Sequence, residues 1–127
     1  MQLMSVNPTT APPAAGGYVN ALLVDGATRL LFISGQIPQT ADGHVPAGID
    51  EQCRLIWVNL TAALVEAGMG ITNLVKVTTF LSNRSYATAN TAVRTEVLGV
   101  HKPALTVIVT DIFDPAWLLE IEAIAAA

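Results

Sequence analysis

Apolar and polar positions divide the chain into short apolar runs and two segments with helical spacing. Two runs rich in Val, Leu, Ile and Phe occupy residues 18–24 and 28–34, and Asp25-Gly26-Ala27 separates them. Asp-Gly between two such runs is typical of a β-hairpin, because Gly accepts the positive φ of a tight turn. The apolar centre of the second run does not alternate with polar residues, which is typical of a strand covered on both faces. We therefore expect a hairpin over residues 18–34.

A long helix is expected after the Gly- and Pro-containing loop of residues 36–48. Asp50 and Glu51 fall in its first turn, where acidic side chains interact favourably with the helix dipole. Apolar residues then recur three or four positions apart and form one stripe, which consists of Ile49, Cys53, Ile56, Leu60 and Leu64. Gly68 is expected to end the helix as a left-handed cap.

The remainder of the chain predicts three strands and a second helix. The strands are expected at residues 74–81, 104–109 and 118–125, and the helix at residues 85–97. The order β-β-α-β-α-β-β predicts an α+β fold, a two-layer α/β arrangement with two helices on one face of a mixed sheet. Residues 1–16 are rich in Pro and Thr and are expected to form an extended N-terminal arm, which leaves residues 17–127 as a single domain.

The composition adds a constraint on assembly. Hydrophobic residues make up 52% of the 127 residues and charged residues only 13%, well below the usual charged share of about 25%. A two-layer domain leaves one sheet face bare, and so few charges do not cover the surface of a small monomer. No apolar run reaches the length of about 18 residues typical of a membrane span, and the N-terminus does not resemble a signal peptide. We therefore expect a cytoplasmic oligomer without a membrane partner.

Charge and metal-ligating residues exclude further classes of function. The formal net charge is −4 and Lys and Arg form no cluster, so nucleic-acid binding is not expected. The single cysteine, Cys53, excludes an intrachain disulfide and lies in the apolar stripe, where a packed core thiol is favoured over a nucleophile. His44 and His101 are isolated from other ligating residues, so no metal site is expected.

Polar residues inside apolar strands are the first candidates for chemistry. Glu120 and Glu122 are two positions apart and therefore point to the same face of the last strand. Either one of them acts as a general acid or positions a water at a subunit boundary, or both are solvent-facing charges. Ser34-Gly35-Gln36 ends the second strand abruptly, which is consistent with a ligand site or with an ordinary strand exit.

Several segments resemble a known family. Phe-Ile-Ser-Gly-Gln-Ile-Pro at residues 32–38 and Glu-Ile-Glu-Ala-Ile-Ala at residues 120–125 are similar to segments of the RidA (YjgF-type) reactive-intermediate deaminases, and residues 17–21 match in order. The resemblance implies a chorismate-mutase-like fold and a homotrimer whose sheets form a central barrel, with small-molecule clefts between subunits. It also implies hydrolysis of enamines or imines to a carbonyl compound and ammonia, without metal or cofactor. Some relatives carry an endoribonuclease label, which an acidic chain does not support.

The resemblance assigns roles residue by residue. Glu120 matches the carboxylate that orients the attacking water or protonates through it. The residues that the resemblance places in contact with substrate are Tyr18, Ser34, Gly35, Asn90, Leu105, Thr106 and Val107. Leu105 departs from the family, whose Pro-Ala-Arg-[Ser/Thr] segment supplies an Arg for the substrate carboxylate, whereas this chain reads Pro-Ala-Leu-Thr at residues 103–106.

Two functional hypotheses follow from this departure. The chain is a deaminase that acts on a neutral substrate or uses another carboxylate donor, such as Arg94. Alternatively, it is a non-catalytic binding or assembly protein that kept the trimer and lost the chemistry together with the arginine. Chorismate-mutase chemistry is not expected, because fold does not carry function and the cationic site for a dianionic substrate is missing.

Overall fold

The computed structural model describes residues 1–127 and contains six strands and two α-helices. In chain order these elements are β1 (Gln2–Val6), β2 (Ala21–Asp25), β3 (Leu30–Gln36), α1 (Ile49–Glu66), β4 (Leu74–Leu81), α2 (Ala87–Leu98), β5 (Ala104–Val109) and β6 (Leu119–Ala126). Short 3₁₀ turns precede β4 and α2, at Ile71–Asn73 and Arg84–Tyr86. The four elements predicted after the first helix agree with these bounds to within two residues.

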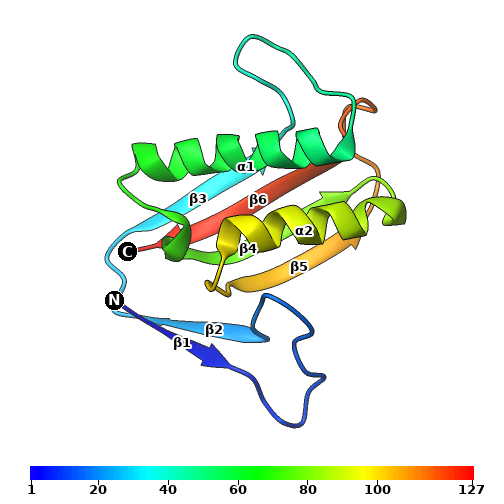
Figure 1. Cartoon of the computed structure of the whole chain (residues 1–127). Helices are drawn as coiled ribbons and strands as arrows, with labels where there is room; N and C mark the ends of the chain where they lie inside the picture. Colours follow the sequence, from blue (N-terminus) through cyan, green and yellow to red (C-terminus); the bar gives the residue numbers. More distant parts are fainter.

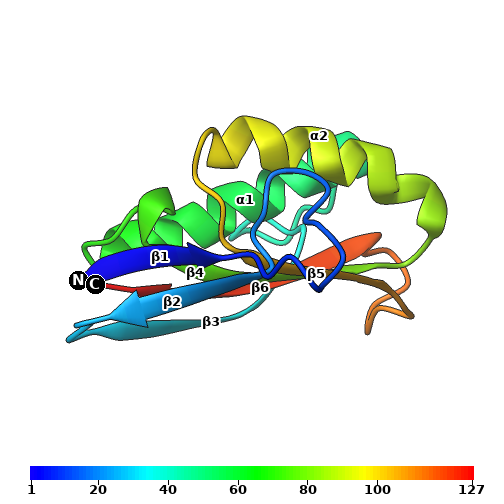
Figure 2. The ribbon, with the colours of Figure 1, turned by 90° about the horizontal axis from the view of Figure 1, so that it is seen from below.

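The strands form two sheets. Four of them are ordered β3-β6-β4-β5, with β4 and β5 parallel and the other pairs antiparallel, and β1 and β2 form a separate two-stranded sheet. Both helices cover the same face of the four-stranded sheet (Figures 1 and 2). The predicted α+β class, with two helices on one face of a mixed sheet, is therefore confirmed.

The predicted hairpin between the first two apolar runs is wrong. Gly26 has the expected positive φ of 71°, but β2 pairs antiparallel with β1 and β3 pairs antiparallel with β6. Backbone N–H groups of Thr28 and Arg29 donate to the carbonyl of Ala127, so the chain turns toward the end of β6. Pairing with β6 buries Ile33 against the helix layer, a tertiary gain that the local turn pattern does not contain. The predicted N-terminal arm thus includes a strand.

The hydrophobic core lies between the helices and the four-stranded sheet. The predicted stripe of the first helix supplies Cys53, Ile56, Leu60 and Leu64, which are fully buried. Each such apolar side chain contributes about 1.5–3 kcal/mol on burial. Gly68 follows the end of α1 with a φ of 71°, as predicted for a left-handed cap.

The face of the four-stranded sheet opposite the helices is bare. Along β3, Phe32 is 71% exposed while its neighbour Ile33 is 6% exposed, so the run predicted to be covered on both faces is covered on one face only. The edge strand β5 exposes Val107, Ile108 and Val109, and strand alternation places Ile108 on this face. Apolar surface of this extent is typical of an interaction surface. None of the helices is both long enough and apolar enough to cross a membrane.

Candidate functional site

A β-bulge interrupts β3 where the sequence predicted a strand end. Ile33 pairs with Ala123 and Gln36 pairs with Ile121, so β3 contains one more residue than β6 over this stretch. Bulges leave a residue unpaired and redirect side chains, and they are frequent beside active sites. Ser34 and Gly35 are the residues in this bulge, and Ser34 is exposed on the bare face.

Glu120 lies directly against the bulge. A Cβ atom placed on Gly35 would be 2.0 Å from Oε2 of Glu120 and 2.8 Å from its Cδ. Only glycine therefore leaves space for the carboxylate in this position. Glu120 also lines a hollow of about 280 Å³ together with Phe80 and Phe113. We call Ser34, Gly35 and Glu120 the strand-end cluster.

The two glutamates of β6 share a face, as the sequence predicted. Their neighbours Leu119, Ile121 and Ala123 are buried in the core. Because side chains alternate along a strand, Glu120 and Glu122 point away from the helices. Glu122 is exposed, and Glu120 is half-buried.

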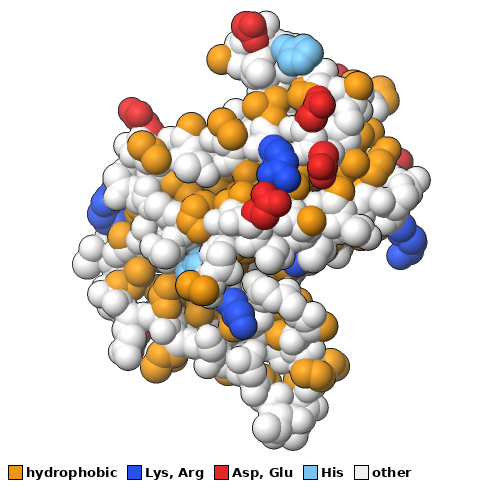
Figure 3. Space-filling model, in the orientation of Figure 1, with side chains coloured by type: hydrophobic (Ala, Val, Ile, Leu, Met, Phe, Trp, Pro, Cys, Tyr) orange, Lys and Arg blue, Asp and Glu red, His pale blue; other side chains and the backbone are white.

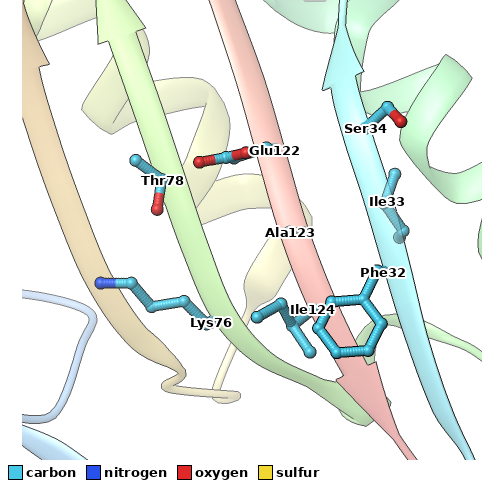
Figure 4. A pocket seen from close by; sticks show the side chains of 8 residues that line it. All are labelled: Phe32, Ile33, Ser34, Lys76, Thr78, Glu122, Ala123 and Ile124. Carbon is cyan, nitrogen blue, oxygen red and sulfur yellow. The ribbon is translucent and has the colours of Figure 1, made fainter.

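A second shallow pocket lies on the same bare face. It has a volume of about 250 Å³ and crosses β3, β6 and β4. Figure 4 shows Glu122 of β6 and Thr78 of β4 directed toward one another, with Lys76 extending toward β5. Lys76 Nζ donates to Thr106 Oγ1 at 2.6 Å. Lys76 was not among the predicted site residues, although its alternation with Thr78 along β4 was a signal for this position.

Asn90, Arg94 and Leu105 lie at the opposite edge of the molecule, on α2 and β5. Asn90 is 1% exposed and occupies the face of α2 that packs toward the sheet. Arg94 follows one helical turn later on the same face and is 5% exposed. Leu105 of β5 pairs with Val77 and packs against the core from the helix side.

Tyr18 reaches this edge from the N-terminal segment. Its neighbour Val19 forms an isolated parallel bridge with Ala104, and the Val19 N–H donates to the Pro103 carbonyl at 3.3 Å. Figure 3 shows a notch on one side of the molecule, between the main body and the lower part, which holds β1, β2 and the segment that joins them. We call Tyr18, Asn90, Arg94 and Leu105 the edge cluster.

The edge cluster is shielded from water on its inner side. Cys53 of α1 is buried, and its Sγ lies 4.0 Å from Oδ1 of Asn90. Burial raises the pKa of the Cys53 thiol to about 11, so the thiol is protonated at neutral pH and unsuited to nucleophilic attack. Burial also lowers the pKa of the Arg94 guanidinium, and the only ionisable groups that oppose this shift are Cys53 and Tyr18.

One chain does not bring the two clusters together. Leu105 faces the helix layer, whereas Glu120 faces away from it, so the four-stranded sheet lies between them. Strand alternation places Val107 on the face of Leu105 and Thr106 on the opposite, bare face. His, Cys, Asp and Glu side chains form no group of three or more that is able to hold a metal ion.

Comparisons with known proteins identify the family. The family model described as endoribonuclease L-PSP matches residues 8–127. A rat protein named 2-iminobutanoate/2-iminopropanoate deaminase is 33% identical over 123 residues, which cover 94% of this chain and 87% of the rat protein. The crystal structure of YyfB, a Rid-family protein of unknown function from Yersinia pestis, has a TM-score of 0.84 at 27% identity and covers both chains completely.

A further solved structure adds a bound small molecule. Escherichia coli TdcF, crystallised with bound serine, has a TM-score of 0.73 at 29% identity, with 98% of each chain covered. The matched segment, the shared fold and the 33% identity to the rat deaminase all agree with the resemblance noted in the strand motifs. The chain belongs to the Rid (YjgF/RidA) family, whose model carries the description endoribonuclease L-PSP.

Proposed function

We propose that the chain is a reactive-intermediate deaminase that hydrolyses small imines or enamines in clefts between the subunits of a homotrimer. The observation that carries this proposal is the carboxylate of Glu120, which lies over Gly35 at a bulge beside a hollow of about 280 Å³. The name of the rat relative and the serine bound to the Escherichia coli relative support a small nitrogen-containing substrate.

The reaction needs one water and one group that exchanges protons. Glu120 accepts a proton from the water while the water oxygen attacks the carbon of the C=N bond. Glu120 returns that proton to the nitrogen, which gives the neutral carbinolamine. The carbinolamine hydroxyl then passes its proton to the nitrogen through Glu120, the C–N bond breaks, and ammonia leaves as the carbonyl forms. An enamine first tautomerises to the imine. The bulge at Ser34 and Gly35 is suited to hold the water, because it leaves backbone groups outside the ladder.

The assembly follows from the split between the two clusters. A substrate that contacts both clusters needs the strand-end cluster of one subunit and the edge cluster of a neighbour, because the sheet separates them within one chain. The exposed Phe32 and the exposed apolar edge of β5 support burial between subunits. We propose a homotrimer with one cleft at each seam. Light scattering coupled to size-exclusion chromatography measures its mass directly.

The catalytic test compares two glutamates on one strand face. An amino-acid dehydratase generates 2-iminopropanoate, and semicarbazide traps what the deaminase has not hydrolysed. The wild-type chain is expected to lower semicarbazone formation. Glu120→Gln is expected to reduce this activity by about 10²–10⁴-fold, because glutamine does not accept the proton from water. Glu122→Gln, two residues away on the same face, is the matched control and is expected to retain activity. Equal activity in the Glu120→Gln variant and the wild type would contradict the mechanism.

A non-catalytic binding protein is the second candidate. The observation that favours it is Leu105, an apolar side chain packed against the core in the edge cluster. This candidate predicts binding of a small ligand by the wild-type chain without any acceleration of imine decay. Calorimetric titration with stable 2-oxo acids, run beside the decay assay, separates the two functions.

A further inference from the structure

Arg94 is a buried cation without a partner. The residue is 5% exposed, yet its side chain forms no hydrogen bond and no salt bridge within the chain. The chain has one ion pair, between the exposed side chains of Arg54 and Glu96 at 2.7 Å. Burying an unpaired charge is unfavourable, so buried charges are usually paired. Within the isolated chain, the Arg94 guanidinium therefore has only solvent as a partner.

The surroundings of Arg94 are neutral and partly polar. No Asp or Glu is among the groups that shift its pKa; the two charged or ionisable neighbours are the Cys53 thiol and the Tyr18 phenol. Asn90, one turn earlier on α2, adds an amide on the same helix face. This arrangement supplies hydrogen-bonding groups around a cation but no counter-charge.

The guanidinium keeps a route to solvent. The side-chain polar atoms that are completely enclosed and unpaired are Nε1 of Trp57 and Oγ1 of Thr79, and no Arg94 nitrogen is among them. A purely structural arginine at this depth is expected to bond to backbone carbonyls, because buried polar groups are usually hydrogen-bonded. Arg94 bonds to none, so its donors are free to bind a molecule that enters from the edge.

We propose that Arg94 is the anion-binding residue of the edge cluster and that its guanidinium binds the carboxylate of a small 2-imino or 2-oxo acid. This inference rests on the proposed function of the cleft and specifies its substrate class. Arginine presents a planar set of donors that matches a carboxylate with two parallel hydrogen bonds. Tyr18 and Asn90 add neutral polar contacts, and Leu105 forms an apolar wall suited to a short alkyl group.

Binding of the carboxylate at Arg94 also orients the substrate. Glu120 lies in the other cluster, on a different face of the sheet. A substrate carboxylate bound to Arg94 of one subunit is neutralised by the guanidinium, which reduces its repulsion with the Glu120 carboxylate of the neighbour. The C=N carbon is then the part of the molecule that is directed toward the strand-end cluster.

The test uses a charged ligand and its neutral isostere. 2-Oxobutanoate and 2-oxobutanamide are titrated into the full-length oligomer by calorimetry. The wild type is expected to bind the acid at least about tenfold more tightly than the amide, the usual size of a charge-assisted contact. Arg94→Met is expected to remove that preference and leave the affinity for the amide unchanged. Arg94→Lys is expected to restore part of the preference, and Arg84→Met, which removes an exposed cation from the turn before α2, is expected to change nothing.

Two results would overturn the proposal. One is an unchanged preference for the acid in Arg94→Met. The other is dissociation of the oligomer in Arg94→Met, which would show that a carboxylate of a neighbouring subunit pairs with Arg94. The proposed function fails independently of the anion site. If the wild type does not hydrolyse imines but binds the acid through Arg94, the deaminase function is contradicted and the anion site is supported. If the wild type hydrolyses imines but binds the acid without a contribution from Arg94, the deaminase function is supported and the anion site is contradicted.

Discussion

The strand-end cluster and the edge cluster hold their charged groups in opposite ways. Glu120 lies over a backbone position that only glycine leaves open, and it faces a hollow on the bare side of the sheet. Arg94 lies on the buried face of α2 and has no acidic neighbour. The acid is placed by a local irregularity of one strand, and the cation by the packing of a helix.

In the proposed site, the two clusters therefore have different roles. The bulge provides a position for water and a group that exchanges protons, whereas the enclosed edge provides affinity for one end of a substrate. The proposed mechanism needs both clusters, and the four-stranded sheet separates them within one chain. Under the proposed function, assembly is therefore required for turnover.

The largest expected effect comes from separating the two clusters altogether. Phe32→Glu places a charge on the bare sheet face, where the phenyl ring is 71% exposed in the single chain. Burying that charge between subunits is unfavourable, so the variant is expected to be monomeric by light scattering and inactive on 2-iminopropanoate. Val65→Glu is the control, since Val65 is 66% exposed on α1, in the helix layer. An active monomer would show that one chain completes the site.

The next largest effect is expected from a substitution that disturbs only the strand-end cluster. Gly35→Ala puts a Cβ atom 2.0 Å from Oε2 of Glu120, so the flexible carboxylate end of Glu120 is expected to move. A displacement of this size is expected to lower kcat by about 100-fold. The melting temperature and the affinity for 2-oxobutanoate are expected to stay close to those of the wild type. A kcat within twofold of the wild type, despite the substitution, would contradict the placement of Glu120.

Moving the cation within the edge cluster is expected to have a smaller effect. Leu105→Arg restores a guanidinium at the position where the Rid resemblance expects one. In the Arg94→Met background it is expected to recover about tenfold in acid affinity. In the wild-type background it is expected to add little, because Arg94 already serves this end of the cleft. A large gain in the wild-type background would assign the anchor to position 105 alone.

The smallest expected effect is a change in stability with pH that depends on the exclusion of water from Cys53, beside the edge cluster. The Cys53 thiol has a pKa raised by burial from 9.0 to about 11, so the folded state keeps a proton that the unfolded state releases between these values. Stability is therefore expected to fall as the pH rises from 9 to 11, by at most about 2–3 kcal/mol. Urea denaturation across this pH range is expected to show a flatter profile for Cys53→Ala. Identical profiles for the two proteins would mean that the thiol reaches water.

Local patterns predicted most of the elements. The stripe that runs from Ile49 to Leu64 predicted α1, and the left-handed Gly68 predicted its end, because both depend on residues close in the chain. The alternation around Glu120 and Glu122 predicted their shared face for the same reason. The hairpin over residues 18–34 failed because strand pairing depends on partners far away in the sequence, here β1 and β6.

For the candidate site, the sequence by itself determined which residues are available: an acid in the last strand, a Ser-Gly pair at a strand end, and Leu105 in place of an arginine. Only the tertiary structure decided that Glu120 rests on Gly35 and that Arg94 is enclosed without a partner. It also decided that these groups lie on opposite sides of one sheet. The reason is physical: spacing along a chain fixes the face of a helix or strand, whereas burial and cross-strand contact depend on segments that meet only after folding.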